Sequence, residues 1–322
     1  MDFSLFEADK LYVLGNGFDL HHNVPSCYGN FRDFLQRDFP EVYNLLIKLY
    51  GDLGDVWWRT FEESLANFDP DKYPKDVVRK PFFNTLNDFR KKYGDDVCHK
   101  FDDYENQYPE DLSKPYIRAS LIAEIEMNIL KQKLSYAFGE WVKDLPKPDE
   151  SLMVKDLNKD ALFFTFNYTR TLEDLYGIDE DQVVHLHGSI DRGIFEFGHN
   201  KTFEEMIEQD LDKHAYERNP LLDKGEDEAR TAMFQVVEEL KKPVDEIIDE
   251  HSNDFNKLEG LKEMEILGMS YSPIDLPYLE RIIEVTGKDI KVILGWHSDE
   301  DKVNAEAFAK KAKLTDYELK DF

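Results

Sequence analysis

Short apolar runs, each followed by a mixed polar and apolar stretch, recur along this chain. The runs predict buried strands at 10–14, 161–166, 182–186, 193–197, 264–267 and 290–295. Apolar side chains at three- and four-residue spacing predict helices at 28–39, 116–142, 170–175, 276–285 and 301–313. Because short strands alternate with helices, we predict an α/β fold with a Rossmann-like parallel sheet and helical insertions.

Two stretches of the chain lack a strand pattern and are charged and helical. We predict an α/β core over 1–40 and 151–322, with one helical insertion at 41–150. A second insertion at 201–260 is a candidate lid, on its length alone. Its predicted apolar face consists of Phe234, Val237, Leu240, Val244 and Ile248.

The first predicted strand runs directly into a glycine-rich turn, Gly15-Asn16-Gly17. A buried strand that ends in such a turn leaves several backbone N–H groups without partners, and these groups bind phosphate. Glycine also lets a ligand approach the main chain closely. The turn is neither a complete G-x-G-x-x-G motif nor a P-loop, so a tight turn with nothing bound is the alternative.

Candidate site residues follow three further predicted strands. Asn167 follows the second strand, His187 the third, and Gly268 the strand at 264–267. Ligands of α/β sheets bind beyond the carboxyl ends of the strands. We therefore predict that Gly17 and these three residues meet around one pocket.

Two of these residues carry polar groups suited to catalysis. The amide of Asn167 can orient a hydroxyl or a water molecule, and its alternative role is to cap the helix near Arg170. His187, at a strand tip and titrating near neutral pH, suits general-base catalysis, with a structural histidine as the alternative. His185 lies two residues earlier, on the same face of the strand, and can orient His187 or line the pocket.

Asp19 follows the glycine turn and has three alternative roles. Its carboxylate can bind ribose hydroxyls, hold a cation or cap the next turn. Together with His185, His187 and His199 it forms an alternative metal site. The spacing of these residues is only a loose match to a metal motif, so we expect no metal.

Composition narrows the class of partner. The net charge of −28 weighs against a nucleic-acid partner, although it does not exclude a small nucleotide. The apolar runs are too short to cross a membrane, and no secretory signal is visible. Cys27 and Cys98 form neither a disulfide framework nor a metal knuckle, so we expect a cytoplasmic protein.

Taken together, these motifs resemble the AbiH family of phage abortive-infection proteins. The resemblance rests on Gly15-Asn-Gly-Phe-Asp-Leu20, Phe166-Asn-Tyr-Thr169, His185-Leu-His-Gly188, Gly198-His199 and Gly268-Met-Ser270. The AbiH family in turn looks like a remote relative of the sirtuin-type NAD-binding fold. The resemblance therefore implies a sirtuin-like core.

The sirtuin resemblance also implies roles for individual residues. The glycine turn would hold the NAD pyrophosphate, Asn167 would lie beside the nicotinamide ribose, and His187 would be catalytic. The implied cofactor-binding set is Gly15, Asn16, Gly17, Phe18, Asp19, Thr165, His185, Gly188, Gly268 and Ser270. Thr169 stands where sirtuins carry Asp, and the cysteines of the sirtuin zinc module are absent from the sequence, so deacylation is not expected.

Defence proteins with this fold more often cleave NAD. We therefore predict a phage-defence protein that binds NAD as its substrate and hydrolyses the nicotinamide–ribose bond. Its partners would be a small nucleotide ligand and either further copies of itself or another protein of the defence system. The alternatives are a nucleotide sensor without turnover and a metal-dependent nuclease or phosphohydrolase that a chelator would inhibit.

Overall fold

The computed structural model describes residues 8–51, 53–69, 91, 115–214, 231 and 233–322. The chain divides into two compact units. Unit 1 comprises Met1–Phe31, Phe138–Phe197 and Lys242–Phe322, and unit 2 comprises Arg32–Ala137 and Gly198–Lys241. All residues after Lys241 therefore belong to unit 1, including part of the stretch predicted as the second insertion.

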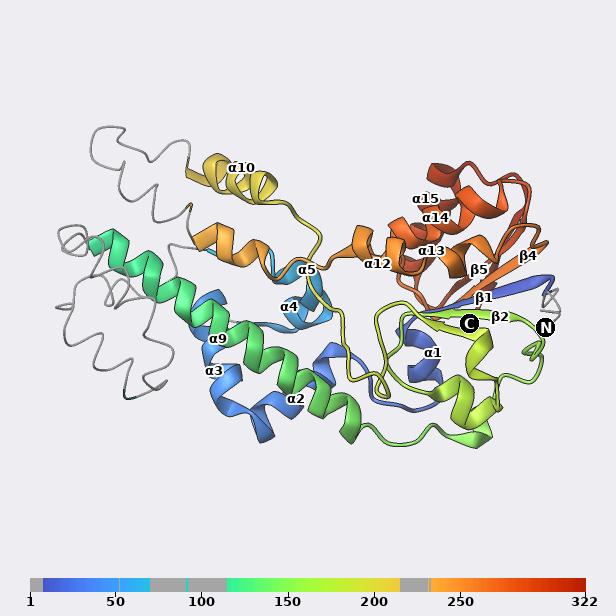
Figure 1. The fold of residues 1–322 in the computed structure, drawn as a ribbon, viewed down its shortest axis with the longest axis horizontal. Coiled ribbons are helices and arrows are strands. Elements are labelled where there is room, and N and C mark those ends of the chain that lie inside the picture. Colours follow the sequence, from blue (N-terminus) through green and yellow to red (C-terminus); the bar gives the residue numbers. More distant parts are fainter. Residues whose placement is uncertain (1–7, 52, 70–90, 92–114, 215–230, 232) are drawn as a thin grey trace. The chain divides into compact units, whose positions relative to one another are not determined.

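Unit 1 is built on a six-stranded parallel sheet with the order β3-β2-β1-β4-β5-β6 (Figure 1). The strands are β1 (Lys10–Leu14), β2 (Leu162–Thr165), β3 (Val183–His185), β4 (Glu263–Leu267), β5 (Lys291–Trp296) and β6 (Tyr317–Asp321). This is the strand order of the Rossmann fold, in which the direction of winding reverses between β1 and β4. The predicted α/β class and Rossmann-like parallel sheet are confirmed.

Most residues of the central strands are apolar, as expected for a sheet that is covered on both faces, although β4 also contains Glu263 and Glu265. In β1, Leu11 and Val13 pack into one core, whereas Tyr12 and Leu14 pack into the other. Successive side chains of a strand point to opposite faces, which explains this alternation. A continuous apolar run is therefore the expected signal of a strand at this position.

Helices cover both faces of the sheet (Figure 1). The larger core includes residues of α12 (Val244–Glu250), α13 (Ser252–Asn256), α14 (Leu276–Thr286) and α15 (Asp299–Ala312). The smaller core includes residues of α1 (Asn16–His21) and of a π-helix, Leu172–Tyr176. Ser298 starts α15 with a capping box to Asp301, which satisfies N–H groups of its first turn.

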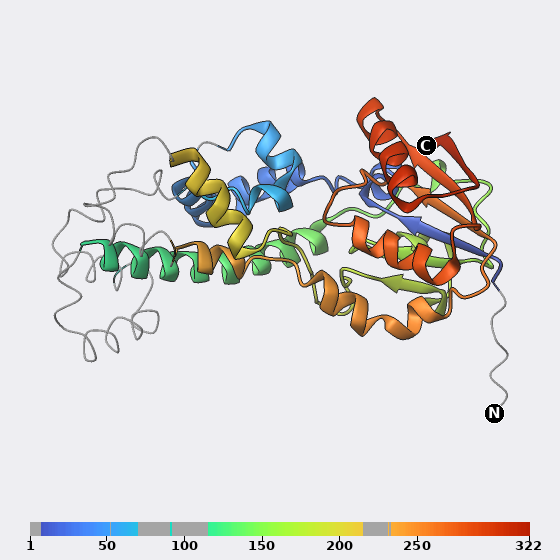
Figure 2. The ribbon, with the colours of Figure 1, turned by 90° about the horizontal axis from the view of Figure 1, so that it is seen from above.

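The other elements described are helices, and Figure 2 shows the chain from a second side. They are α2 (Tyr28–Asp38), α3 (Pro40–Tyr50), α4 (Asp55–Arg59), α5 (Phe61–Ser64), α9 (Pro115–Asp144) and α10 (Phe203–His214). Short 3-10 helices lie at Glu150–Leu152 and Glu180–Gln182. Within unit 2, Lys48 of α3 forms an ion pair with the buried Glu126 of α9, and the ring of Trp58 stacks on that of Phe61.

Three predicted features differ from the structure. The stretch 193–197 is not a strand, because its backbone turns back on the preceding loop, where the Glu196 N–H donates to the carbonyl of His187 at 2.9 Å. β6 was not predicted, because its residues are mostly polar and exposed. The apolar stripe predicted between Phe234 and Ile248 is interrupted before Pro243, where α12 begins as a separate helix.

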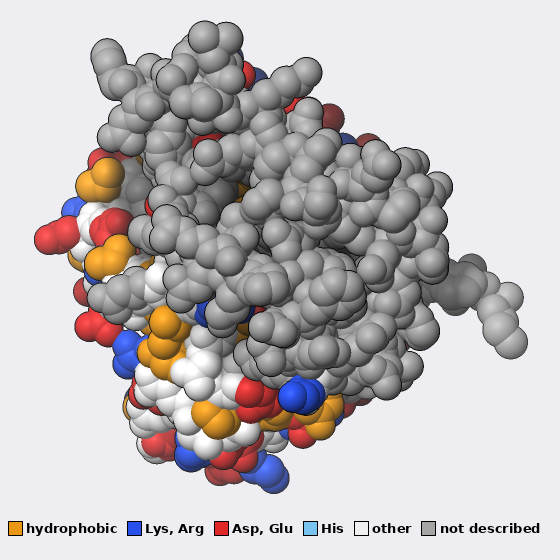
Figure 3. Space-filling model, turned by 90° about the vertical axis from the view of Figure 1, so that its left-hand side faces the viewer, with side chains coloured by type: hydrophobic (Ala, Val, Ile, Leu, Met, Phe, Trp, Pro, Cys, Tyr) orange, Lys and Arg blue, Asp and Glu red, His pale blue; other side chains and the backbone are white. Residues whose placement is uncertain are grey.

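Two surface observations complete the description. None of the helices in the described part of the chain is both long enough and apolar enough to cross a membrane. On the face drawn in Figure 3, the coloured side chains mix acidic, basic and hydrophobic types.

Candidate functional site

The glycine turn after β1 packs directly on the turn after β4. The Gly15 N–H donates to the Leu267 carbonyl at 2.9 Å, and the Gly17 N–H donates to the Gly268 carbonyl at 2.8 Å. A Cβ on Gly17 would lie 2.6 Å from the Cα of Gly268, so the close approach requires glycine. The prediction that the turn leaves these N–H groups without partners is therefore wrong at Gly15 and Gly17.

Asn167 links the end of β2 to the same turn. Its side-chain Nδ2 donates to the Gly15 carbonyl at 3.1 Å, and the residue is 6% exposed. The alternative capping role is wrong, because the helix that follows has Thr171 at its N-cap. Gly17, Asn167 and Gly268 therefore lie together at the carboxyl edge of the sheet, and that they surround one pocket with His187 stays a prediction.

Asp19 is a buried residue of α1, the helix that follows the glycine turn. Its carboxylate accepts hydrogen bonds from the hydroxyls of Thr169 at 2.7 Å and Thr171 at 2.6 Å. Burial raises the pKa of Asp19, although these hydrogen bonds and the nearby His185 act to lower it. Thr169, which departs from the sirtuin pattern, thus holds the Asp19 carboxylate in place.

His185 joins this network at the end of β3. Its Nδ1 lies 3.0 Å from the Asn167 carbonyl, and its Nε2 lies 3.0 Å from Glu173 Oε1. Burial acts to raise the pKa of Glu173, but the hydrogen bond and charge of His185 outweigh it and lower the pKa. Both ring nitrogens are thus engaged, and His185 positions the backbone of Asn167.

His187 lies in an aromatic environment and is only 4% exposed. The rings of Phe166 and Tyr278 meet its imidazole edge to face, with centroids 4.8 Å and 5.4 Å away. Two charged residues flank it: Lys242 Nζ lies 3.2 Å from Nδ1, and Asp275 Oδ1 lies 3.7 Å from Nε2. Lys242 and Asp275 were not predicted as site residues.

The electrostatic environment keeps the His187 ring neutral. Burial and the positive charge of Lys242 lower the pKa of His187 well below its usual value, so the prediction that it titrates near neutral pH is wrong. Its Nε2 atom is buried and has no hydrogen-bond partner among the described residues. A buried polar atom without a partner is uncommon in folded proteins, so Nε2 is the atom most suited to meet a ligand.

The remaining predicted residues lie in or near this edge, and their binding roles stay predictions. Phe18 is a core residue, and Thr165 accepts a hydrogen bond from the Asn167 N–H. Asn16 accepts one from the hydroxyl of Ser26. Gly188 has a φ of 81°, and Ser270 is exposed.

The structure gives no support to the alternative metal site. His199 belongs to unit 2, where its Nε2 bonds the Val237 carbonyl at 2.9 Å and its Nδ1 accepts from the Lys201 N–H at 3.2 Å. Within the described ranges, no three His, Cys, Asp or Glu residues are grouped so that they could hold a metal ion.

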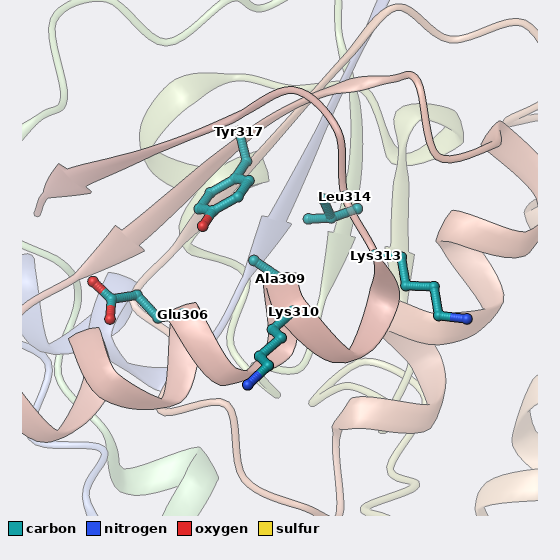
Figure 4. A pocket seen from close by; sticks show the side chains of 6 residues that line it. All are labelled: Glu306, Ala309, Lys310, Lys313, Leu314 and Tyr317. Carbon is teal, nitrogen blue, oxygen red and sulfur yellow. The ribbon is translucent and has the colours of Figure 1, made fainter.

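A surface hollow lies at the opposite edge of the sheet. It adjoins Tyr317, the first residue of β6, and the last turns of α15 (Figure 4). Its lining residues are Glu306, Ala309, Lys310, Lys313, Leu314 and Tyr317. Because it lies at the amino end of a parallel strand, it is separate from the strand-end residues described above.

Comparison with known families identifies the chain. The family described as Bacteriophage abortive infection AbiH matches residues 11–296, which is most of the 322 residues. The chain belongs to the AbiH family. Membership confirms the resemblance seen in the sequence and places this AbiH protein in phage abortive infection, a form of defence. Comparisons with curated proteins and with solved structures give no match.

The lowered pKa of the buried His187 predicts that the stability of this AbiH protein depends on pH. The pKa of His187 is lowered in the folded state, so below about pH 6.5 the unfolded chain binds a proton that the folded chain does not. We expect the free energy of unfolding to fall as the pH drops, by about 1.4 kcal/mol per pH unit for this residue.

Urea denaturation at several pH values between 7 and 5 checks this expectation. His187→Gln should reduce the pH dependence, whereas the exposed His297→Gln serves as the control. Equal pH dependence in the wild type and in His187→Gln would contradict it.

Proposed function

We propose that this AbiH protein binds NAD at the carboxyl edge of the unit 1 sheet and hydrolyses the bond between nicotinamide and ribose. The observation that carries the proposal is the buried, neutral His187, whose Nε2 atom has no hydrogen-bond partner among the described residues. It lies at the strand ends of a Rossmann-like sheet, where such folds bind nucleotides. This last point is an analogy between folds, so the proposed reaction is argued from the side chains at this edge.

The reaction breaks the C–N bond of the substrate and one O–H bond of water, and it forms a C–O bond. The C–N bond between the ribose and nicotinamide breaks, and its electron pair neutralises the pyridinium nitrogen of the leaving nicotinamide. A water oxygen then bonds to the anomeric carbon, which has oxocarbenium character, and one water proton goes to a base. The products are nicotinamide, ADP-ribose and a proton.

Asn167 and His187 are the residues we assign to the reacting ribose. Asn167 is fixed by its bond to the Gly15 carbonyl, which holds its amide at the end of β2. Asp275 lies beside His187 and is the candidate acceptor for the water proton. The glycine turn has two of its N–H groups occupied, so pyrophosphate binding there would need other donors, such as the N–H of Asn16.

The low exposure of His187 fits an enzyme that is inactive until infection. At 4% exposure, the side chain can meet a ligand only after its neighbours move. Uncontrolled NAD cleavage would harm the host cell, so a closed resting state is expected for such an activity.

The direct test is to incubate the purified full-length chain with NAD and follow nicotinamide and ADP-ribose by chromatography. The incubation is repeated with lysate of phage-infected cells and with a chelator. We expect one nicotinamide for each NAD lost, and no effect of the chelator.

Three outcomes would count against the proposal. Constant NAD under every condition would overturn it. Tight NAD binding in calorimetry without nicotinamide release would indicate a sensor instead. Loss of the activity with chelator would indicate the metal-dependent alternative.

A further inference from the structure

Lys242 is a charged residue buried next to His187. Its side chain is fully shielded from solvent, and it directly precedes Pro243 at the start of α12. Its Nζ lies 3.2 Å from His187 Nδ1 and 3.8 Å from Asp275 Oδ1. Lysines are almost never fully buried unless they are paired, and His187 and Asp275 are two of the groups that Lys242 contacts.

We infer that Lys242 is a positioning residue that fixes the ring proton of His187 on Nε2, so that His187 donates a hydrogen bond to the substrate. The identity of that substrate rests on the proposed function. The assignment of the tautomer rests only on the contacts of His187 and holds for any ligand.

The argument follows from which atoms can donate. A lysine ammonium has only donors, so at 3.2 Å it requires the Nδ1 atom of His187 to accept. A neutral imidazole carries one N–H, which must then lie on Nε2. The edge-to-face contacts with Phe166 and Tyr278 hold the plane of the ring. The Nε2–H group therefore has a fixed direction.

This arrangement changes the role predicted for His187. An Nε2 atom that already carries hydrogen cannot accept a proton from water, but it can donate to a ribose hydroxyl or to the oxygen of the attacking water. The water proton would then pass to the carboxylate of Asp275, whose side chain is 20% exposed. When the water O–H bond breaks, its electron pair forms the new bond from oxygen to the anomeric carbon.

The tautomer can be measured without any enzymatic activity. Long-range proton–nitrogen NMR spectra of the full-length chain, labelled with ¹⁵N-histidine, distinguish the two neutral forms from the protonated ring. The His187→Gln variant identifies the signal. We expect the Nε2–H tautomer in the wild type and a several-fold larger Nδ1–H population in Lys242→Met.

Matched variants separate this effect from general disturbance. Lys241→Met changes an adjacent but exposed lysine and should leave the His187 tautomer unchanged. Lys242→Arg keeps a donor and should preserve it. An Nδ1–H or doubly protonated ring in the wild type would overturn the inference, even if Lys242→Met does not fold. An unchanged tautomer in folded Lys242→Met would do the same, whereas absent NAD cleavage would affect only the proposed function.

Discussion

His187→Ala should slow nicotinamide release on the order of 100- to 1000-fold, the usual effect of removing one positioned donor from an active site. The reason is that alanine removes the Nε2 atom, which has no hydrogen-bond partner among the described residues and is the proposed donor to the substrate. The measurement is the initial rate of nicotinamide formation at saturating NAD, under the condition that activates the wild type.

The control is His251→Ala. His251 lies between α12 and α13 and pairs with Asp254, so its loss should leave the rate unchanged. A His187→Ala protein that folds and retains the wild-type rate would remove His187 from the reaction. Asn167→Ala is a second test, provided that its folding is checked, because Asn167 also holds the Gly15 turn.

Gly268→Ala should destabilise unit 1 by about 3 kcal/mol, the sum of overpacking and left-handed backbone strain. Gly268 has a φ of 67°, and a Cβ at this position would lie 2.3 Å from the backbone nitrogen of Phe18. Phe18 lies in α1 and Gly268 in the turn after β4, so relief of this clash would disturb the contact between these two segments. The free energy of unfolding from urea titration measures the effect.

Gly260→Ala provides the matched control. Its φ is 87°, but a Cβ there would have no atom within 4 Å. It should therefore lose only the strain of the left-handed conformation, about 1 kcal/mol. Similar losses in the two variants would show that the turn after β4 is looser than the contacts indicate.

Much of the fold could be predicted because the central strands are buried on both faces. Such strands appear in the sequence as continuous apolar runs, as in Leu11 to Leu14. β6 has the opposite signal, since an edge strand with polar, exposed side chains resembles a loop. Residues 193–197 were misread because their apolar side chains pack without forming a ladder; Phe195, for example, contacts Phe138.

The site could be predicted only in part. The rule that parallel strands share a carboxyl edge was enough to bring Gly17, Asn167 and Gly268 together. It could not show that the N–H groups of the turn after β1 donate to the carbonyls of Leu267 and Gly268. Lys242 was missed because it follows a charged helical stretch, where lysine is usually solvated. Asp275 was missed because it directly precedes a helix, where aspartate usually serves as a cap.

The strand tips have little freedom to move apart. Hydrogen bonds cross from the β1 turn to Gly268 of the β4 turn and to Asn167 at the end of β2. Under the proposed function, an opening that admits the substrate would therefore leave this edge assembled. It would also have to keep Lys242 against His187 Nδ1 and Asp275 near Nε2, because the inferred tautomer and the proton acceptor depend on these contacts.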